Sequence, residues 1–176
     1  MTKEIVEWIK SIVIAVVVAL LIKRFLFYSV LVSGVSMEPS LHDRDRLFAS
    51  KLPLYYDGLR HGDIISFRAP DSIKEKNYIK RIVGLPGDFM EVKDGRVYRN
   101  GEELVEDYIE PGSYTDNCGI NTWTVEEGQV FVLGDNRLPG ASNDSRFFGT
   151  ISKDAIGGVS NFRYYPLDRN FGRLNK

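Results

Sequence analysis

The sequence predicts a mainly β protein, with an antiparallel β-sheet domain behind one N-terminal transmembrane helix. Two observations predict it: an unbroken apolar run lies near the N-terminus, and most of the 16 glycines and 7 prolines fall after residue 33. There they separate short segments rich in β-branched and aromatic residues, which is typical of strands and turns. With 176 residues the chain has room for one domain. We expect residues 1–27 to form the N-terminus and anchor, and residues 28–176 to form the β domain.

The anchor is predicted from residues 12–22, all of which are apolar. This run is shorter than the ~20 residues that span a hydrocarbon core. A helix over about residues 5–25 would be long enough, with Lys10, Lys23 and Arg24 reaching the membrane interfaces. Basic residues lie on both sides of the run, so the charge distribution does not decide the orientation.

Two other interpretations of this segment remain. A cleaved signal peptide has an apolar core of similar length, but no Ala-x-Ala-like cleavage site follows residue 22. A buried core helix is the second, although a continuous apolar run leaves no polar face for solvent.

The body of the chain reads as strands joined by turns. We expect strands over residues 28–32, 63–67, 78–83, 90–93, 96–99, 129–133 and 158–164. Asp94-Gly95 predicts a tight hairpin turn, and Asn100-Gly101 predicts a further turn. Residues 33–41 form a turn-rich stretch that opens into a short helix, and residues 51–62 and 107–122 are expected to be loops.

Composition excludes several classes of function. The net charge is −1, so no basic face indicates a nucleic-acid partner. Cys118 is the single cysteine, which rules out a disulfide within the chain and a zinc site built on cysteine pairs. We interpret it as an inert loop thiol. We expect no metal and no cofactor, because the two histidines, His42 and His61, lack the spacing of a metal site.

The histidines also bear on catalysis. A Ser-His-Asp triad needs a histidine held by a carboxylate, and His42 lies only six residues after Ser36. The sequence does not exclude this arrangement, although solvated turn histidines are the simpler interpretation.

Ser36 is a candidate nucleophile because of its neighbours. Gly34 lets the backbone bend closely, and Pro39 prevents a continuing strand. Ser36 is therefore expected on a sharp turn, with its hydroxyl projecting and its own N–H available to an oxyanion. Taken alone, a plain turn serine is the simpler interpretation.

Lys80 is a candidate base because of its place in a predicted strand. Tyr78 and Ile82 share its face, whereas Arg81 lies on the other face among apolar residues. A lysine buried there loses its proton more easily, because desolvation penalises the ammonium. Lowering its pKa from about 10.4 to near 7 corresponds to roughly 4 to 5 kcal/mol, and the neutral amine can accept a serine proton. An ordinary edge-strand lysine is the alternative.

Residues 134–146 form the third cluster and read Gly-Asp-Asn-Arg-Leu-Pro-Gly-Ala-Ser-Asn-Asp-Ser-Arg. So many turn formers and charges directly after the apolar strand at 130–133 favour a fixed loop at a site. A β-turn with surface ion pairs is the alternative.

Together the three clusters resemble the type I signal peptidases in their short Gram-positive bacterial form. Residues 36–41 (Ser-Met-Glu-Pro-Ser-Leu) resemble the family's nucleophile motif, and residues 78–88 resemble its lysine motif nearly residue for residue. Residues 60–67, 134–137 and 142–146 match the remaining motifs. The resemblance runs from the anchor to about Tyr165, and it implies an antiparallel core like that of the signal peptidases and SOS-repressor proteases.

The resemblance implies a role for each matched residue. Ser36 would be the nucleophile and Lys80 the general base, oriented by a hydrogen bond from Ser142. Asp144 and Arg146 would form an ion pair that fixes the loop, with Asp135 nearby.

The same resemblance implies how the substrate is held. The backbone N–H of Ser36 would bind the oxyanion, and Met37 and Val35 would contact the substrate, which adds to the sheet as a strand. Gly34 stands where some members carry a serine that helps to bind the oxyanion, so the Ser36 N–H would carry more of that role.

It also implies substrate, partners and location. The enzyme would be a serine endopeptidase that cleaves N-terminal signal peptides from secretory preproteins with small residues before the cleavage site. It would cross the lipid bilayer once, with the N-terminus cytoplasmic and the catalytic domain on the outer face.

One departure and two rival functions follow from the same residues. Four residues, 138–141, separate Arg137 from Ser142, where the family usually has two. The longer loop could change where Ser142 lies. The self-cleaving SOS repressors share this catalytic core but carry a DNA-binding domain, which we do not find in this sequence. A membrane-anchored β module that only binds peptides is the rival from another class.

Overall fold

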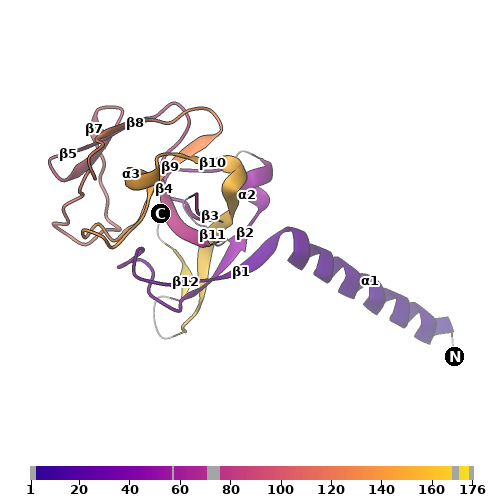
Figure 1. Ribbon diagram of the computed structural model, residues 1–176. Helices are drawn as coiled ribbons and strands as arrows, with labels where there is room; N and C mark the ends of the chain where they lie inside the picture. Colours follow the sequence, from indigo (N-terminus) through magenta and orange to yellow (C-terminus); the bar gives the residue numbers. More distant parts are fainter. Residues whose placement is uncertain (1–2, 57, 71–75, 168–170, 175–176) are drawn as a thin grey trace.

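The structure is a computed structural model that describes residues 3–56, 58–70, 76–167 and 171–174. It consists of a β body and one long helix that projects from it at the N-terminal end (Figure 1). The body contains two antiparallel sheets. The prediction of a mainly antiparallel β protein is confirmed.

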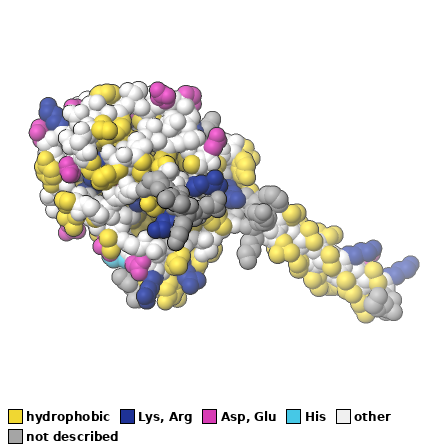
Figure 2. All heavy atoms as spheres, in the orientation of Figure 1, with side chains coloured by type: hydrophobic (Ala, Val, Ile, Leu, Met, Phe, Trp, Pro, Cys, Tyr) yellow, Lys and Arg dark blue, Asp and Glu magenta, His cyan; other side chains and the backbone are white. Residues whose placement is uncertain are grey.

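The N-terminal helix α1 covers Lys3–Phe25, close to the predicted range of 5–25. Most of its apolar side chains from Ile5 to Leu21 are exposed, and Figure 2 shows hydrophobic side chains along the length of the helix. Within the residues that the structure describes, no helix has both the length and the apolar character that a membrane crossing requires. The membrane-spanning role of α1 stays a prediction, and the side chains of Lys23 and Arg24 lie outside the described part of the chain.

The larger sheet has eight strands in the order β1-β2-β11-β3-β4-β9-β10, with β12 also paired to β11. Its strands are β1 (Phe27–Leu31), β2 (Arg46–Ser50), β3 (Ile64–Arg68), β4 (Asn77–Gly84), β9 (Gln129–Leu133), β10 (Ile151–Ser152), β11 (Ile156–Tyr165) and β12 (Gly172–Arg173). The smaller sheet, in the order β7-β6-β5-β8, contains β5 (Phe89–Lys93), β6 (Arg96–Arg99), β7 (Glu102–Glu103) and β8 (Thr122–Thr124). Three short helical segments complete the body: α2 (Leu52–Tyr55), α3 (Ser145–Phe148) and η1 (Lys153–Ala155).

Both faces of the larger sheet are covered at its centre, which explains why β3 and β4 lack a polar face. Ile65 and Phe67 pack with Ile82 in one apolar cluster, whereas Ile64 and Ile79 pack in another. Strand alternation sends neighbouring residues to opposite faces, so each cluster takes every second residue. A third cluster joins the smaller sheet to β4 and β9.

The predicted hairpins are confirmed by their backbone conformation. Asp94 and Gly95 have φ values of 51° and 77°, and Asn100 and Gly101 have 55° and 84°. Positive φ at both central residues is the geometry that twisted two-residue hairpins require, and Asn, Asp and Gly tolerate it best. These turns could be read from the sequence because the requirement is local.

Some elements differ from the predictions. The short helix expected within residues 33–41 is wrong: this stretch consists of bends and turns. Strand β2 was not predicted, although Leu47 and Ala49 alternate with exposed residues along it. Helix α2 occupies part of the loop expected at 51–62.

A substitution in the first hairpin turn tests its role. Gly95→Ala should lower the free energy of unfolding by about 2 kcal/mol, because the new methyl group meets both an unfavourable positive φ and the ring of Tyr114. Gly101→Ala is the matched control: φ there is also positive, but no atom of the described structure beyond the two adjacent residues lies within 4 Å of the added methyl, so about 1 kcal/mol is expected. Denaturant unfolding of both variants measures the difference. Equal losses of stability would show that the overlap with the Tyr114 ring does not add to the cost.

Candidate active site

The candidate nucleophile lies on the turn that follows β1. Gly34 has a φ of 93° and donates its N–H to Asp43 Oδ1 at 2.8 Å. The turn is closed by a hydrogen bond of 3.1 Å from the N–H of Glu38 to the carbonyl of Val35. Met37 is 1% exposed and packs in the core, so it anchors the turn while Ser36 stays at the surface of a cleft.

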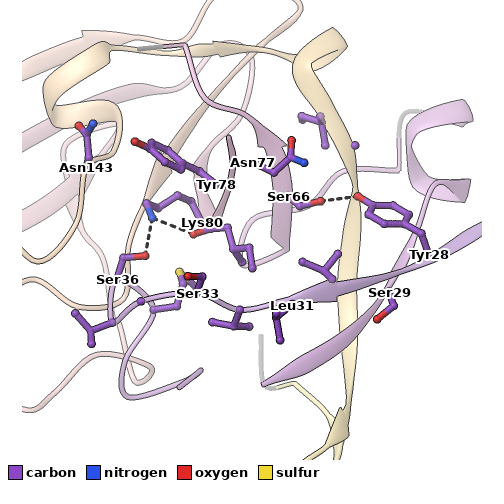
Figure 3. A pocket seen from close by; sticks show the side chains of 18 of the residues that line it. Tyr28, Ser29, Leu31, Ser33, Ser36, Ser66, Asn77, Tyr78, Lys80 and Asn143 are labelled. Atoms are coloured by element: carbon purple, nitrogen blue, oxygen red, sulfur yellow. Dashed lines mark hydrogen bonds between the residues drawn. The ribbon is translucent and has the colours of Figure 1, made fainter. Parts of the chain in front are cut away.

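The structure brings Ser36 and Lys80 together. Lys80 lies on β4, is 3% exposed, and donates a hydrogen bond of 2.7 Å from Nζ to Ser36 Oγ (Figure 3). Its Nζ also donates to the carbonyl of Ile79 at 3.0 Å and lies 5.3 Å from the centre of the Tyr78 ring. The side chain of Lys80 is therefore buried, and the interpretation as an ordinary solvated lysine of an edge strand is wrong.

Burial lowers the pKa of Lys80 from its ordinary value of 10.5 to about 8. The dominant cause is desolvation of the ammonium; the charges of Asp144 and Asp135 act in the opposite direction, and Arg146 adds to the decrease. A lysine with this pKa is neutral in about one molecule in ten at pH 7, far more than an ordinary lysine, and a neutral amine is a base.

Asp144 and Arg146 form a buried ion pair, as the sequence predicts. The Nε of Arg146 donates to Asp144 Oδ1 and its Nη2 donates to Oδ2, both at 2.8 Å. Burial by itself would raise the pKa of Asp144, but the hydrogen bonds and charge of Arg146, with the N–H of Gly134, hold it below its usual range. Asp144 is therefore an ionised residue at the base of the site.

Ser142 is buried beside this pair. Its Oγ donates to Asp144 Oδ2 at 2.7 Å. The sequence led us to expect this hydroxyl to bond Lys80, and within the described residues its bond goes to Asp144 instead. Its role in orienting Lys80 stays a prediction.

Gly134 is the point where the loop meets the nucleophile turn. A methyl group at this position would overlap both Ser142 Oγ and the carbonyl oxygen of Ser36. Only glycine therefore allows the end of β9, the Ser142 loop and the Ser36 turn to approach this closely.

Asp135 is held by a residue that the sequence reasoning did not assign to the site. Arg81 donates to both carboxylate oxygens of Asp135, at 2.9 and 2.7 Å, and its guanidinium lies 4.0 Å from the centre of the Tyr108 ring. The signal was present in the sequence, since Arg81 lies among apolar residues on its strand face.

A second buried arginine holds the same loop. Arg137 donates to both oxygens of Glu106, at 2.9 and 2.5 Å, and to the carbonyl of Gly134 at 2.9 Å. Tyr108 donates its hydroxyl to Glu106 at 2.7 Å. No sequence pattern links Glu106 to Arg137, because 31 residues separate them.

An open cleft of about 1000 Å³ extends from the Ser36–Lys80 pair. Its lining includes residues 28–37 on one side and 77–80 on the other. Tyr28 and Ser66, joined by a hydrogen bond, lie away from the Ser36–Lys80 pair in Figure 3. Both walls have free backbone edges within the described chain, because β1 pairs only with β2, and β9 pairs with β4 only from Arg81 onward.

Met37 and Val35, expected to contact the substrate, both line the cleft. Neither histidine is among its lining residues: His61 bonds Asp88, and the N–H of His42 bonds Asp45. Ser36 is thus paired with a lysine, and no Ser-His-Asp arrangement forms around it in the described structure.

The four residues at 138–141 form a turn closed by a 3.1 Å hydrogen bond from the N–H of Ala141 to the carbonyl of Leu138. Leu138 is 64% exposed, so the turn extends outward, and Ser142 beyond it is buried.

A serine hydroxyl and a buried amine at the edge of a cleft in a β domain are chemically suited to a hydrolase. Comparison with known proteins supports this class. The family described as "Signal peptidase, peptidase S26" matches residues 5–165. A signal peptidase I of Bacillus licheniformis is 41% identical over 170 residues, covering 92% of this chain and 89% of that protein. Signal peptidase I T of Bacillus subtilis is 40% identical over 175 residues, covering 95% and 89%.

A crystal structure of a signal peptidase I from Enterococcus faecalis is 35% identical, covers 57% of this chain and 95% of that one, and has a TM-score of 0.48. The chain belongs to the signal peptidase family, peptidase S26, and is a peptidase of that family. The family resemblance drawn from the sequence motifs is confirmed. The roles of the individual site residues stay predictions.

The buried amine has a measurable cost. A decrease in the pKa of Lys80 from 10.5 to about 8 means that burying the protonated amine lowers the free energy of unfolding by about 3 kcal/mol. Lys80→Met should therefore unfold at a higher temperature than the unmodified chain. Because the folded-state pKa is the lower one, this gain should be full below pH 8, shrink between pH 8 and 10.5, and vanish above. Calorimetry across pH 6–11 measures it, and a gain independent of pH would contradict the burial argument.

Proposed function

We propose that the chain is a membrane-anchored serine endopeptidase that removes N-terminal signal peptides from secretory preproteins, with Ser36 as nucleophile and Lys80 as general base. The observation that carries this proposal is the 2.7 Å contact between Lys80 Nζ and Ser36 Oγ, made by an amine that is only 3% exposed. Distance and burial are the two requirements for such a base.

In the proposed mechanism the neutral amine of Lys80 accepts the proton of Ser36 while Oγ attacks the scissile carbonyl carbon. The negative charge that develops on the carbonyl oxygen is stabilised by the N–H of Ser36, which makes no hydrogen bond within the described chain. The ammonium then gives its proton to the leaving amine, which frees the mature protein. Lys80 next activates a water, which hydrolyses the ester on Ser36 and releases the signal peptide.

The free edges of the cleft support an extended substrate. A peptide lying between residues 31–35 and 77–80 can bond to the backbone of both, and its alternate side chains point to the floor. Met37 forms part of that floor and Val35 part of the rim. The small residues before the cleavage site would be those that enter here.

The loop residues have supporting roles in this proposal. Asp144 and Arg146 fix the position of Ser142 through their bidentate pair, and Asp135 does the same for the start of the loop through Arg81. We propose that Ser142 orients Lys80 during the reaction. When the amine accepts the proton of Ser36 it becomes an ammonium, and the Ser142 hydroxyl can then accept a hydrogen bond from it.

The membrane anchor is proposed from two surfaces. The apolar side chains of α1 are exposed, and α1 leads directly into β1. Phe48 on β2, Phe162 on β11 and Phe171 before β12 are exposed; the ring of Phe162 lies 5.3 Å from that of Phe171, and the ring of Phe48 lies 4.4 Å from that of the half-buried Tyr164. Exposed aromatic residues of this kind suit a membrane interface. We propose that the N-terminus is cytoplasmic and the β domain lies on the outer face.

The chemistry is tested with Ser36→Ala and Lys80→Met. Both variants should fold but lose processing of a secretory precursor by at least about 10³-fold, because each removes one of the two reacting groups. Gel-based cleavage by detergent-purified enzyme measures this. Processing retained by either variant would overturn the mechanism and favour a peptide-binding module.

The pH dependence tests the base. The free enzyme's kcat/KM should rise about tenfold per pH unit at low pH and level off near pH 8, because only the neutral amine accepts the proton. A profile with its midpoint near 6.5 would instead indicate a histidine.

The location is tested in cells. Alkaline carbonate should leave the full chain in the membrane fraction, and protease added to intact spheroplasts should remove the β domain. A β domain protected from protease in intact spheroplasts would contradict the proposed orientation. Release of the chain by carbonate would contradict the proposed membrane anchor.

A further inference from the structure

Asn136 holds the backbone on both sides of the nucleophile. Its side-chain Nδ2 donates to the carbonyl of Val35 at 3.0 Å, and its backbone N–H donates to the carbonyl of Ser36 at 3.1 Å. Among the described residues, Asn136 is the one that bonds both of these consecutive carbonyls, the first through its side chain and the second through its backbone. Asn136 lies on the loop that follows β9, 101 residues from Val35, so this contact exists only in the folded chain.

The peptide unit between Val35 and Ser36 is the one that matters for chemistry. Its N–H is that of Ser36, the donor that the proposed mechanism directs at the oxyanion. Because a peptide is planar and trans, its C=O and N–H point in opposite directions, so fixing the carbonyl of Val35 also fixes the direction of the Ser36 N–H. A hydrogen bond into that carbonyl polarises the peptide and strengthens its N–H as a donor.

Asn136 is itself held firmly. Its Oδ1 accepts the N–H of Leu138 at 3.2 Å, which orients the amide so that Nδ2 points at Val35. The residues on either side are anchored by buried ion pairs, Asp135 with Arg81 and Arg137 with Glu106. The loop is therefore a rigid support, able to transmit its position to the Ser36 turn.

The turn does not need Asn136 in order to form. The N–H of Glu38 also bonds the carbonyl of Val35, at 3.1 Å, and Met37 anchors the turn in the core. Loss of the amide should thus leave the turn folded, with the Val35 carbonyl held by one donor instead of two and the direction of its peptide less tightly fixed. This separates a positioning role from a structural one.

We propose that Asn136 is a positioning residue that aims the Ser36 N–H at the oxyanion of the transition state. The inference rests on the proposed function, because it assumes Ser36 as nucleophile. The inference goes beyond the proposed function because it assigns the direction of the oxyanion-binding N–H to a side chain that does not touch the substrate.

The test compares Asn136→Asp with Asn117→Asp. In Asn136→Asp the Oδ1 acceptor for Leu138 is retained, but the donor to Val35 becomes a carboxylate oxygen. Asn117 makes the equivalent local bond, from the N–H of Gly119 to its Oδ1 at 3.1 Å, on a different loop, so it controls for the change in charge and turn geometry. Asn136→Ala removes the donor without adding charge.

Both Asn136 variants should lower kcat by about 10- to 100-fold, less than loss of an oxyanion donor itself, with KM changed less than about threefold. The pH midpoint of kcat/KM in Asn136→Ala should stay near 8, and its unfolding temperature should stay within a few degrees. Asn117→Asp should match the unmodified enzyme.

Three results would overturn the inference: a kcat for Asn136→Ala equal to that of Asn117→Asp, a loss confined to KM, or a loss explained by a shifted pH midpoint, since the effect would then act through Lys80. Ser36→Ala is measured in the same assay. If it still cleaves, the proposed function fails; if it is inactive while Asn136→Ala is fully active, only the inference fails.

Discussion

The rest of the site depends on the burial of one amine. Lys80 lies in an inner strand with apolar clusters on both faces of the sheet, and desolvation brings its pKa to about 8. Two carboxylates nearby, Asp135 and Asp144, act in the opposite direction and raise this pKa. Each is held by an arginine in a bidentate pair. The arginines therefore engage the carboxylates that could otherwise pair directly with the lysine.

The same arginines organise the backbone. Buried pairs join β4 to the loop after β9 through Arg81, and the loop at 106 to that same loop through Arg137. Breaking such a pair leaves an uncompensated buried charge, which costs several kcal/mol. The loop at 134–146 is thus rigid although it has little regular structure. That rigidity is what places Gly134, Asn136 and Ser142 against the Ser36 turn.

Local features were predicted well from the sequence and long-range ones were not. The turns at 94–95 and 100–101 follow from residues that tolerate positive φ, which is a property of two positions. Strand β2 was missed because its alternation is short and lies between turns, and pairing with β1 and β11 decides it. Ser142 was placed in the site, but the approach of its loop to the Ser36 turn depends on Gly134 and Asn136, which only the folded chain brings to that turn.

The sequence by itself determined the β class, the N-terminal helix, the motifs around Ser36 and Lys80, and through them the family. These are local patterns, and each can be read within a few residues. Only the tertiary structure decided that Lys80 is buried, that its amine lies 2.7 Å from Ser36 Oγ, and that Glu106 and Asn136 support the site. The physical reason is that desolvation and hydrogen-bond direction depend on what surrounds a group in space, and those neighbours come from distant parts of the chain.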